Sequence, residues 1–330
     1  MKKHLSKLMA VVLLFNSFGG FTYAKQIKQN KAQKDKVKSS VVKKPQSEEK
    51  KEEVDYKEII KNLNKKLLWK MVIDGRYHSK GKYICDKGGK VSKGLRAGRE
   101  PGYLKAMLGA FKYMVKTIGE EKIDENLFRE FHKRALTKVG IRYKFDCTDY
   151  WGNEDEHASF PIGGKGNTNE KGKEELFEKK KDGWECEREL KPLVMRVSNK
   201  PGNRLFAHMS KTPEESRDFA KLTFETYYKK LEELKENGVV EGSWIGENRS
   251  EKDKKLEIII RICQCLDQAH TFYDGNIRTI VFLTMNKMLV ENGLSPVCMW
   301  NPNCLDVIDV ETLIKEVKKG QERFQEIFMK

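Results

Sequence analysis

The sequence lacks several features that would point to a function at once. It has no Walker-type phosphate loop, no internal repeat and, beyond the short apolar run near its start, no second hydrophobic span. These absences argue against a P-loop nucleotide hydrolase, a repeat scaffold and a multi-span membrane protein. The glycine-rich run at 163–166 is no substitute for a phosphate loop, because no apolar helical pattern follows it. The 6 histidines and 7 cysteines show no spacing typical of a zinc site.

The first 55 residues predict an export signal followed by a linker. Residues 1–24 combine a basic start, a short apolar run and the small-residue site at 22–24, as secretory signal peptides do. The alternative is an uncleaved membrane anchor. Residues 25–55 hold few large apolar side chains, so they cannot bury enough surface to fold alone. We interpret them as a disordered charged linker rather than a basic arm for nucleic acid or membrane, because acids interrupt the lysines and no aromatics are interleaved.

We therefore expect a secreted chain, periplasmic or extracellular, with delivery into a host cell as a further option and no transmembrane helix after processing. Charged residues make up 35% of the sequence and the formal net charge is +16. Such charge favours solubility and attraction to acidic partners, but it names no partner.

Residues 56–330 are long enough for one large domain with a substantial core. Apolar residues at helical spacing predict helices at 59–73, 103–118, 127–139, 218–236, 256–269, 277–291 and 310–328. Alternating residues predict strands at 141–145 and 193–197, on either side of a Gly-, Asn-, Glu- and Lys-rich insertion within about 140–200. The predicted fold class is mostly α with a small β-hairpin. That hairpin is either ordinary, with a long loop, or a functional flap.

Several chemically capable side chains gather at 270–279, beside a predicted helix start. Residues 256–269 are apolar almost all round, which predicts a helix buried in the middle of the domain. Gly275 breaks that helix, and Asn276 is a good N-cap for the next one.

Arg278 falls in the first turn of the next helix, where the helix macrodipole favours negative charge. A cation there is unfavourable unless an anion binds nearby, so the backbone N–H groups of 275–278 and the guanidinium predict a phosphate site. Asp274 could hold a divalent metal, and His270 could act as a general base. In the alternative interpretation Arg278 pairs with a carboxylate, His270 is a core histidine and Asp274 only starts a turn.

The stretch resembles the core motif of the Fic family, His-Pro-Phe-x-Asp/Glu-Gly-Asn-Gly-Arg-x-x-Arg, which lies between two central helices. The matching residues are His270, Phe272, Asp274, Gly275, Asn276 and Arg278. Residues 289–296 look like the usual exit of the second helix. Residues 127–132 and 140–143 look like the elements before the family's flap. The resemblance implies a Fic-like helical bundle around a central helix-loop-helix, with a flap that pairs with an extended target segment.

The resemblance also implies a role for each matching residue. His270 would deprotonate a target hydroxyl, Phe272 would anchor the loop in the core, and Asp274 would bind Mg²⁺. Asn276 would hold the α-phosphate of the donor, and Arg278 the β-phosphate. As a set, the groups implied for phosphate and nucleotide binding are Gly275, Asn276, Ile277 and Arg278.

The sequence departs from the family pattern at three positions. Thr271 replaces the proline, which should loosen the loop, and Ile277 replaces the second glycine, where its β-carbon crowds the phosphate. Val281 stands where the family has its second arginine, which argues against ordinary ATP-dependent AMP transfer. Residues 243–248 match the short pattern of the family's inhibitory helix, although Gly246 disfavours a helix there.

The resemblance implies a secreted Fic-like transferase that attaches a nucleotide monophosphate (AMP or UMP-like) or a phospho-ligand to a hydroxyl side chain of a target protein. Mg²⁺ and a nucleotide donor such as ATP, UTP or another would be required. A bacterial effector that acts on host proteins is the implied setting. The alternative, motivated by Ile277 and Val281, is a catalytically inactive Fic-fold protein-binding module, and a basic nucleic-acid binder is a third, weaker hypothesis.

Seven cysteines after an export signal leave an odd number for pairing. Cys298 and Cys304 form a candidate disulfide pair near the exit of the central helix. Cys263 and Cys265 lie in the apolar helix and should act as small core residues. The cysteines expected in loop-like regions are Cys85, Cys147 and Cys186. In a reducing cytosol all seven could stay free.

Overall fold

The computed structural model describes residues 54–82, 84, 86, 100–139, 159–162, 166–190, 205–208, 212–246, 248–272 and 274–330. The chain divides into residues 1–52 and 53–330, and all described residues belong to the second unit. The predicted export signal, and the predicted linker up to residue 53, lie outside the described residues.

The described part of the chain is mostly helical, as predicted. Its α-helices are α1 (Tyr56–Lys61), α2 (Tyr103–Thr117), α3 (Glu125–Leu136), α4 (Glu170–Asp182), α5 (Glu185–Arg188), α6 (Pro213–Asn237), α7 (Glu251–Ala269), α8 (Asn286–Glu291) and α9 (Val310–Phe328). The remaining elements are the 3₁₀ turns η1 (Leu68–Met71), η2 (Gly75–Lys80) and η6 (Pro302–Leu305), the π-helical η5 (Arg278–Met285), and the strands β1 (Ser159–Ile162) and β2 (Leu205–His208).

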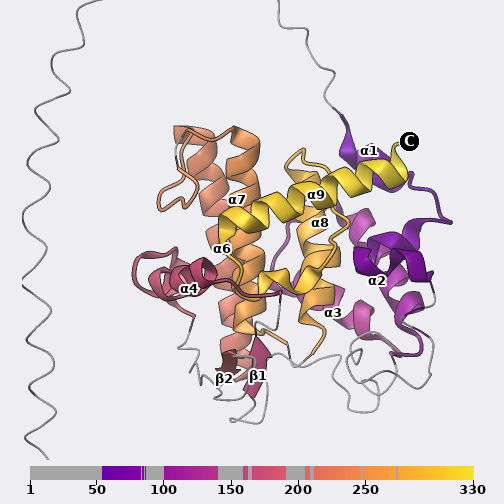
Figure 1. The fold of residues 1–330 in the computed structure, drawn as a ribbon, viewed down its shortest axis with the longest axis horizontal. Helices are drawn as coiled ribbons and strands as arrows, with labels where there is room; N and C mark the ends of the chain where they lie inside the picture. The colour runs from indigo at the N-terminus through magenta and orange to yellow at the C-terminus, as the bar shows by residue number, and fades with distance from the viewer. Residues whose placement is uncertain are drawn as a thin grey trace, which may run out of the picture. The chain divides into compact units, whose positions relative to one another are not determined.

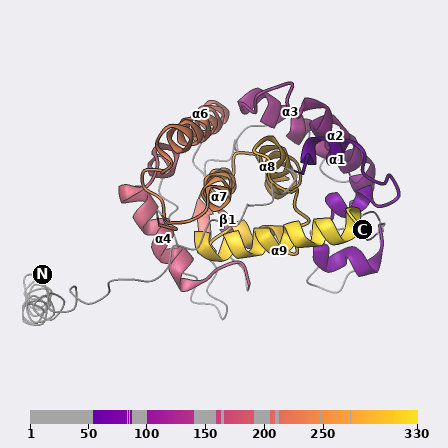
Figure 2. The ribbon, with the colours of Figure 1, turned by 90° about the horizontal axis from the view of Figure 1, so that it is seen from above.

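Helix α7 and the segment η5–α8 form the centre of the helical arrangement. Figure 2 shows α7 and α8 beside each other, with α6, α3, α2 and α9 around them. Helix α7 packs against α6, α9 and η5, and η5 packs in turn against α3 and α2. Every residue of α7 from 256 to 269 is buried, which confirms the apolar central helix predicted there.

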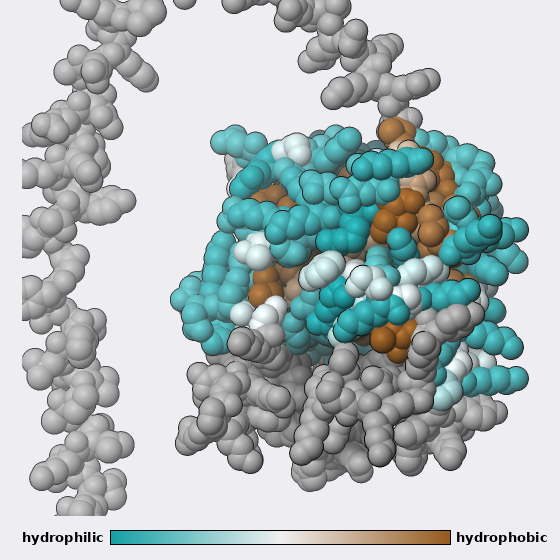
Figure 3. Space-filling model, turned by 45° about the vertical axis from the view of Figure 1, so that its right-hand side comes forward, coloured by the Kyte–Doolittle hydropathy of each residue, from teal (hydrophilic) through white to brown (hydrophobic). Residues whose placement is uncertain are grey.

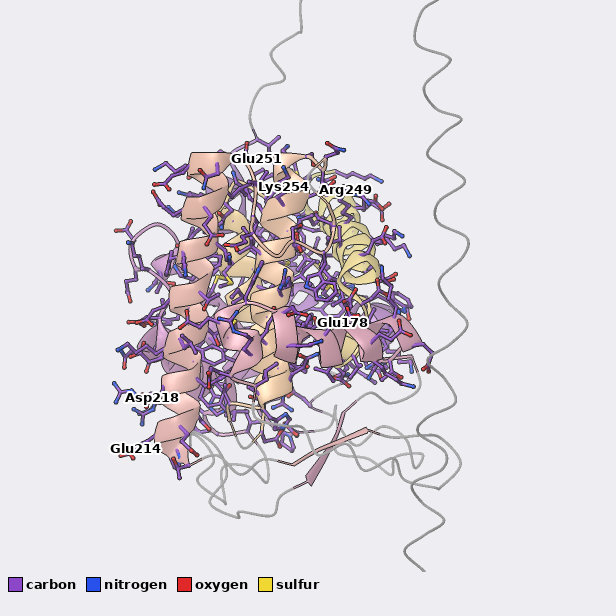
Figure 4. All side chains as sticks on the ribbon, turned by 90° about the vertical axis from the view of Figure 1, so that its left-hand side faces the viewer. Glu178, Glu214, Asp218, Arg249, Glu251 and Lys254 are labelled. Atoms are coloured by element: carbon purple, nitrogen blue, oxygen red, sulfur yellow. The ribbon has the colours of Figure 1, made fainter. Side chains whose placement is uncertain are left out.

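Helices α6 and α7 run antiparallel. Figure 4 places Glu214 and Asp218 at one end of this pair, and Glu251 and Lys254 at the other end. The C-terminal end of α7, which leads into His270, therefore lies at the end where α6 begins. Strands β1 and β2 lie at that same end (Figure 1).

Side-chain caps set the limits of the long helices. The Thr212 hydroxyl accepts a hydrogen bond from the Glu215 amide, the Glu215 carboxylate accepts one from the Thr212 amide, and Pro213 occupies the first turn. This capping box starts α6 before the predicted residue 218. Asp309 caps α9 through the Thr312 amide, and α9 spans the predicted 310–328. Helices α2 and α3 lie close to their predicted ranges.

The helix predicted at 59–73 is wrong in length. Asp55 caps α1 at an earlier residue, and the helix ends at Lys61, before Asn62. The Asn62 side chain bonds back to the Glu58 carbonyl, and the Asn64 side chain accepts from the Lys66 amide. Such local bonds compete with helix continuation, so the chain proceeds in 3₁₀ turns instead.

The insertion contains helices that the sequence did not predict. The predicted strands at 141–145 and 193–197 lie outside the described residues. An antiparallel pair is present between β1 and β2, with Ser159 opposite His208 and Ile162 opposite Leu205. Between these strands lie α4 and α5, and Asn169 caps α4 through the Gly172 amide. Their apolar content is low, which explains why the periodicity did not reveal them.

The second central helix, predicted at 277–291, begins with π-helical turns. A π-helical stretch leaves backbone carbonyls without their α-helical partners. Asn286 is buried, and its side-chain nitrogen Nδ2 lies 3.2 Å from the Phe282 carbonyl oxygen and 3.3 Å from the Val281 carbonyl oxygen. The Asn286 carbonyl oxygen also accepts from the Val297 amide at 2.8 Å. The Asn286 side chain thus provides hydrogen-bond partners for backbone groups at the end of the π-helical stretch.

A buried network of charges joins α5 to α7. The Arg261 guanidinium is 1% exposed and donates to the Glu187 carboxylate at 2.5 and 2.9 Å. It also donates to Glu257 at 3.3 Å and to the Gly242 carbonyl at 2.6 Å. Lys179 of α4 donates to Gln264 of α7 at 2.5 Å. Two buried cations therefore face two buried carboxylates, and each has hydrogen-bond partners.

The disulfide suggested for Cys298 and Cys304 is wrong, because both cysteines are free and buried. The Cys298 sulfur packs 3.5 Å from the Met71 sulfur instead. Cys263 and Cys265 are core residues of α7, as predicted. Cys186 lies on α5 and is buried, whereas a loop position was expected, and Cys85 and Cys147 lie outside the described residues.

The surface is strongly polar. Figure 3 shows one face covered mainly by hydrophilic side chains, with small apolar areas between them. Large apolar side chains that are well exposed among the described residues are Val54, Val239, Trp300 and Met329. Within the part of the chain that the structure covers, no helix has both the length and the apolar character to cross a membrane.

The substitution Arg261→Met tests the buried network. It leaves the Glu187 and Glu257 carboxylates buried without their guanidinium, so we expect the free energy of unfolding to fall by about 3–5 kcal/mol. Urea unfolding followed by circular dichroism measures this. Arg249→Met is the matched control, because Arg249 forms an exposed pair with Glu311 at 3.4 Å and should change stability by less than about 1 kcal/mol. Equal effects of the two substitutions would contradict the prediction.

Candidate functional site

His270 ends the central helix in an unusual backbone conformation. It is the C-cap of α7 and adopts the left-handed region, with φ 51° and ψ 53°. Its amide donates to the Asp267 carbonyl at 3.0 Å. A residue other than glycine rarely adopts this conformation, which costs on the order of 1 kcal/mol and recurs at functional sites. The left-handed turn directs the chain out of the helix and into the loop 271–275.

Helix α3 holds the loop from one side. The Phe272 ring is 1% exposed and stacks on the His132 ring, with centroids 3.8 Å apart and planes 13° apart. It also packs on Phe128, at a centroid distance of 4.8 Å. The His132 Nε2 atom lies 2.7 Å from the Asp274 carbonyl oxygen, at hydrogen-bonding distance. The loop position therefore depends on residues that lie far away in sequence.

Asn276 ties the loop to itself. Its side-chain nitrogen Nδ2 donates to the Phe272 backbone carbonyl at 2.7 Å, and its side-chain oxygen Oδ1 accepts from the Phe272 backbone amide at 2.9 Å. The prediction that Asn276 caps the next helix is wrong, because the Gly275 carbonyl accepts the first helical bond, from the Thr279 amide. The side chain is used inside the loop, and the phosphate contact implied for it would have to be made alongside these bonds.

Thr271 contributes to the same arrangement. Its hydroxyl donates to the Asn276 side-chain oxygen at 3.4 Å, and the residue is 1% exposed. The expected loosening of the loop at this position is therefore offset by a bond that a proline could not make.

Arg278 is buried beside an acid. Its Nη2 atom lies 2.6 Å from the Glu100 carboxylate, and its guanidinium lies 4.7 Å from the centre of the Tyr103 ring. The sequence suggested such pairing with a carboxylate as the alternative to a phosphate site. The Nη1 atom is nevertheless buried and makes no hydrogen bond to any described residue. A buried charged donor without a partner is costly, so this edge of Arg278 is suited to an anion.

Asp274 adjoins the same loop. Its carboxylate accepts from the Gly275 amide at 2.6 Å. Among the described residues no group of three or more His, Cys, Asp or Glu side chains could hold a metal. Mg²⁺ is commonly bound by one or two carboxylates together with substrate phosphates, so Asp274 fits a metal shared with a donor but not an all-protein metal site.

The two departures from the motif differ in position. Val281 is 1% exposed within η5 and belongs to the hydrophobic core, so no cation could be accommodated there without disruption. Ile277 is only partly buried, against the core.

Gly275 has a φ of +78°, and a β-carbon there would meet the Leu136 side chain at 3.0 Å, which explains the need for glycine.

Burial sets the protonation state of His270. Although the residue keeps some exposed surface, its ring lies among protein groups, and this burial lowers its pKa to about 4. The Asp274 carboxylate and a bond to the Asp267 carbonyl oppose the shift without reversing it. The imidazole is therefore neutral near pH 7, the form that can accept a proton.

His270 ends α7, Asp274 lies in the loop that follows, and Arg278 begins η5. The structure adds Glu100, His132 and Asn286, which sequence reasoning missed. Glu100 follows a stretch rich in glycine, lysine and arginine, and a single acid at that place carries no signal of its partner. His132 was part of the motif-like run at 127–132, but nothing in that run foretold its contact with Asp274.

Comparison with known proteins gives a partial similarity. No family model matches the chain. A stretch of 68 residues, 21% of this chain, is 35% identical to AnkX of Legionella pneumophila subsp. pneumophila, a Fic-domain phosphocholine transferase. The match covers 7% of that relative's length. The similarity is weak, and it extends at most to a Fic-like transferase.

Asn276→Ala tests the loop architecture. It leaves the buried amide and carbonyl of Phe272 without partners, so stability should fall by about 2–5 kcal/mol. The Phe272 amide should also exchange its hydrogen faster, as measured by hydrogen–deuterium exchange. Thr271→Val serves as the control, since it removes only the bond of 3.4 Å and should cost less than about 1 kcal/mol. Unchanged exchange at Phe272 in Asn276→Ala would overturn the assignment.

Proposed function

We propose that the chain is a Fic-like transferase that moves a phosphate-linked group from a nucleotide donor onto a hydroxyl side chain of a target protein. The observation that carries this proposal is the presence of two features at the two ends of the short segment 270–278. A neutral histidine ends α7, and the buried Nη1 edge of Arg278 lacks a partner among the described residues. The partial similarity to AnkX supports the same class of reaction.

The chemistry follows from these two groups. His270 removes the proton from the target hydroxyl, and the hydroxyl oxygen forms a bond to the donor phosphorus while the anhydride P–O bond breaks. Arg278 and the loop N–H groups neutralise charge on the phosphates. Asp274 would hold Mg²⁺ together with the donor's phosphates, where the metal would stabilise negative charge that develops on the leaving group. Phe272 and Asn276 fix the loop so that these groups keep their positions.

The transferred group in this proposal is a small phospho-ligand rather than AMP. Val281 provides no second cation for a distal phosphate, and Ile277 places a side chain where the motif has its second glycine. A nucleoside diphosphate that has the ligand on its terminal phosphate has less negative charge than a nucleoside triphosphate. Fewer cations are therefore needed to bind it. The name of the similar relative, a phosphocholine transferase, agrees with this choice. Export and action on host proteins, implied by residues 1–24 and by the resemblance, are part of the same proposal.

A catalytically inactive binding module is the second candidate. The ion pair of Arg278 with Glu100 favours it, because an internal carboxylate then satisfies the arginine instead of a donor phosphate. The two candidates differ in whether a donor binds and whether a group is transferred.

Transfer is tested with the full chain, Mg²⁺ and a host-cell lysate. CDP-choline, ATP and UTP are supplied separately, and modified proteins are analysed by mass spectrometry. We expect an added mass equal to the phospho-ligand with CDP-choline, and at least a hundredfold less labelling with His270→Ala. Labelling by ATP or UTP alone would refute the phospho-ligand assignment. No labelling by any donor, or equal labelling by His270→Ala, would refute the transferase.

Glu100→Gln should tighten donor binding. The change removes a negative charge beside the bound phosphates while it keeps the shape of the side chain. We expect about tenfold tighter binding of CDP-choline with Mg²⁺, measured by calorimetry. Glu125→Gln is the matched control, because the Glu125 side chain has the same 12% exposure as that of Glu100 but pairs with Arg217. Weaker binding by Glu100→Gln would show that Glu100 supports the site.

The pH dependence of transfer follows from the lowered pKa of His270. Below its pKa the imidazolium cannot accept a proton, so activity is lost as the pH falls through that value. With a pKa of about 4, labelling should stay constant from about pH 7 to about pH 5 and decline only at lower pH. Circular dichroism at each pH excludes unfolding. A decline centred near pH 6.5 would contradict the buried state of the ring.

A further inference from the structure

A cavity of about 730 Å³ is bordered by the C-terminal part of α6 and the N-terminal end of α7. Figure 4 places Glu251 and Lys254, which line it, at the end of the α6–α7 pair opposite to Glu214 and Asp218. At 1.5 Å per residue, Lys254 lies about 24 Å along the helix from His270. The cavity is therefore separate from the candidate functional site.

The acids that line the cavity already have lysine partners. The Glu251 carboxylate pairs with Lys255 at 2.7 Å, within the first turns of α7. The Glu232 carboxylate lies 3.8 Å from the Lys235 ammonium on α6. All four of these residues line the cavity, and so do the further lysines Lys122 and Lys254. The cavity wall thus carries more positive than negative charge.

Lys254 is a buried cation without a carboxylate partner. It is 8% exposed, its ammonium donates to the Gly238 carbonyl at 2.8 Å, and no carboxylate of the described residues forms an ion pair with it. Gly238 is the C-cap of α6, where the helix macrodipole favours a cation. This bond uses one of the three donors of the ammonium. A buried cation on a cavity wall, with donors to spare, is suited to an anion.

Lys122 adds a second positive charge beside an aromatic ring. Its Nζ atom lies 5.4 Å from the centre of the Tyr228 ring, and both residues line the cavity. Burial raises the pKa of Tyr228 to about 12, so the phenol adds no negative charge at neutral pH. Leu231 and Leu234 provide an apolar part of the wall. The volume lies within the range of about 300–1,000 Å³ that is usual for small-molecule sites.

We infer that this cavity binds a small organic phosphate monoester. Its phosphate contacts Lys254 and Lys122, and its organic part packs against Tyr228 and Leu231. A phosphate monoester carries a charge of about −1.5 to −2 at neutral pH, which matches two lysines that lack carboxylate partners. The ligand joins α6 to the start of α7. The site is independent of the proposed transfer reaction.

Calorimetric titration of the full chain with phenyl phosphate tests the inference. This probe combines a phosphate monoester with one apolar ring, whereas inorganic phosphate lacks the ring and phenol lacks the charge. We expect phenyl phosphate to bind at least tenfold more tightly than inorganic phosphate, to raise the melting temperature, and phenol not to bind. Neither heat nor a melting shift with phenyl phosphate, or equal affinity for inorganic phosphate, would overturn the inference.

Lysine substitutions locate the bound phosphate. Lys254→Met and Lys122→Met should each weaken phenyl phosphate at least tenfold, because each removes a charge that contacts the phosphate. Lys122 is exposed, so its substitution leaves the fold intact even if the loss of buried Lys254 disturbs it. Lys252→Met is the matched control, since Lys252 is an exposed lysine of the same helix that does not line the cavity. It should change the affinity less than threefold, and equal effects of all three substitutions would contradict the assignment.

Arg278→Met distinguishes this cavity from the candidate functional site. The substitution removes the phosphate contact proposed there, and we expect it to leave the affinity for phenyl phosphate unchanged within threefold. Circular dichroism confirms that each variant is folded. Loss of binding in Arg278→Met, together with normal binding in Lys254→Met, would assign the phosphate to the candidate functional site and overturn the inference.

Discussion

The arrangement of helices depends on one buried guanidinium. Arg261 lies in the middle of the central helix and binds Glu187 of the insertion, Glu257 of its own helix and the Gly242 carbonyl. Because a charge buried without partners is unstable, these groups must come together or leave the core. The network therefore fixes how α5 and the turn after α6 sit against α7, and it does so with specific geometry that apolar contacts alone would not provide.

That fixed helix supports the loop at its C-terminal end. His270 leaves α7 in a left-handed turn, Phe272 inserts between aromatic rings of α3, and Asn276 closes the loop on the Phe272 backbone. Helix α3, which is distant in sequence, and the residues that flank the loop on both sides thus determine the position of one short segment. The cost of the unusual His270 backbone is tolerable because the surrounding contacts over-determine it.

The sequence predicted the elements whose burial is apolar. Helices α2, α7 and α9 were recognised because apolar residues recur at helical spacing, and α9 was correct at both ends. The insertion helices were missed because their buried side chains include Glu187 and Lys179, which look like surface residues in a sequence. The residue types of the site were recognised from their crowding at 270–278. Their partners were not, because Glu100 and His132 reach the loop only through the tertiary fold.

Arg278 illustrates how such a partner changes the meaning of a site. The cation at a helix start was expected to require an anion, and Glu100 is an anion provided by the chain itself. It binds one edge of a guanidinium that presents several donors in a fixed plane, so the buried Nη1 atom keeps a donor that no described residue uses. In the proposed function a phosphate would use this donor while Glu100 stays in place, so it would lie near a second negative charge. The carboxylate stabilises the buried arginine, and under the proposed function it would give a lower affinity for the donor than the arginine alone.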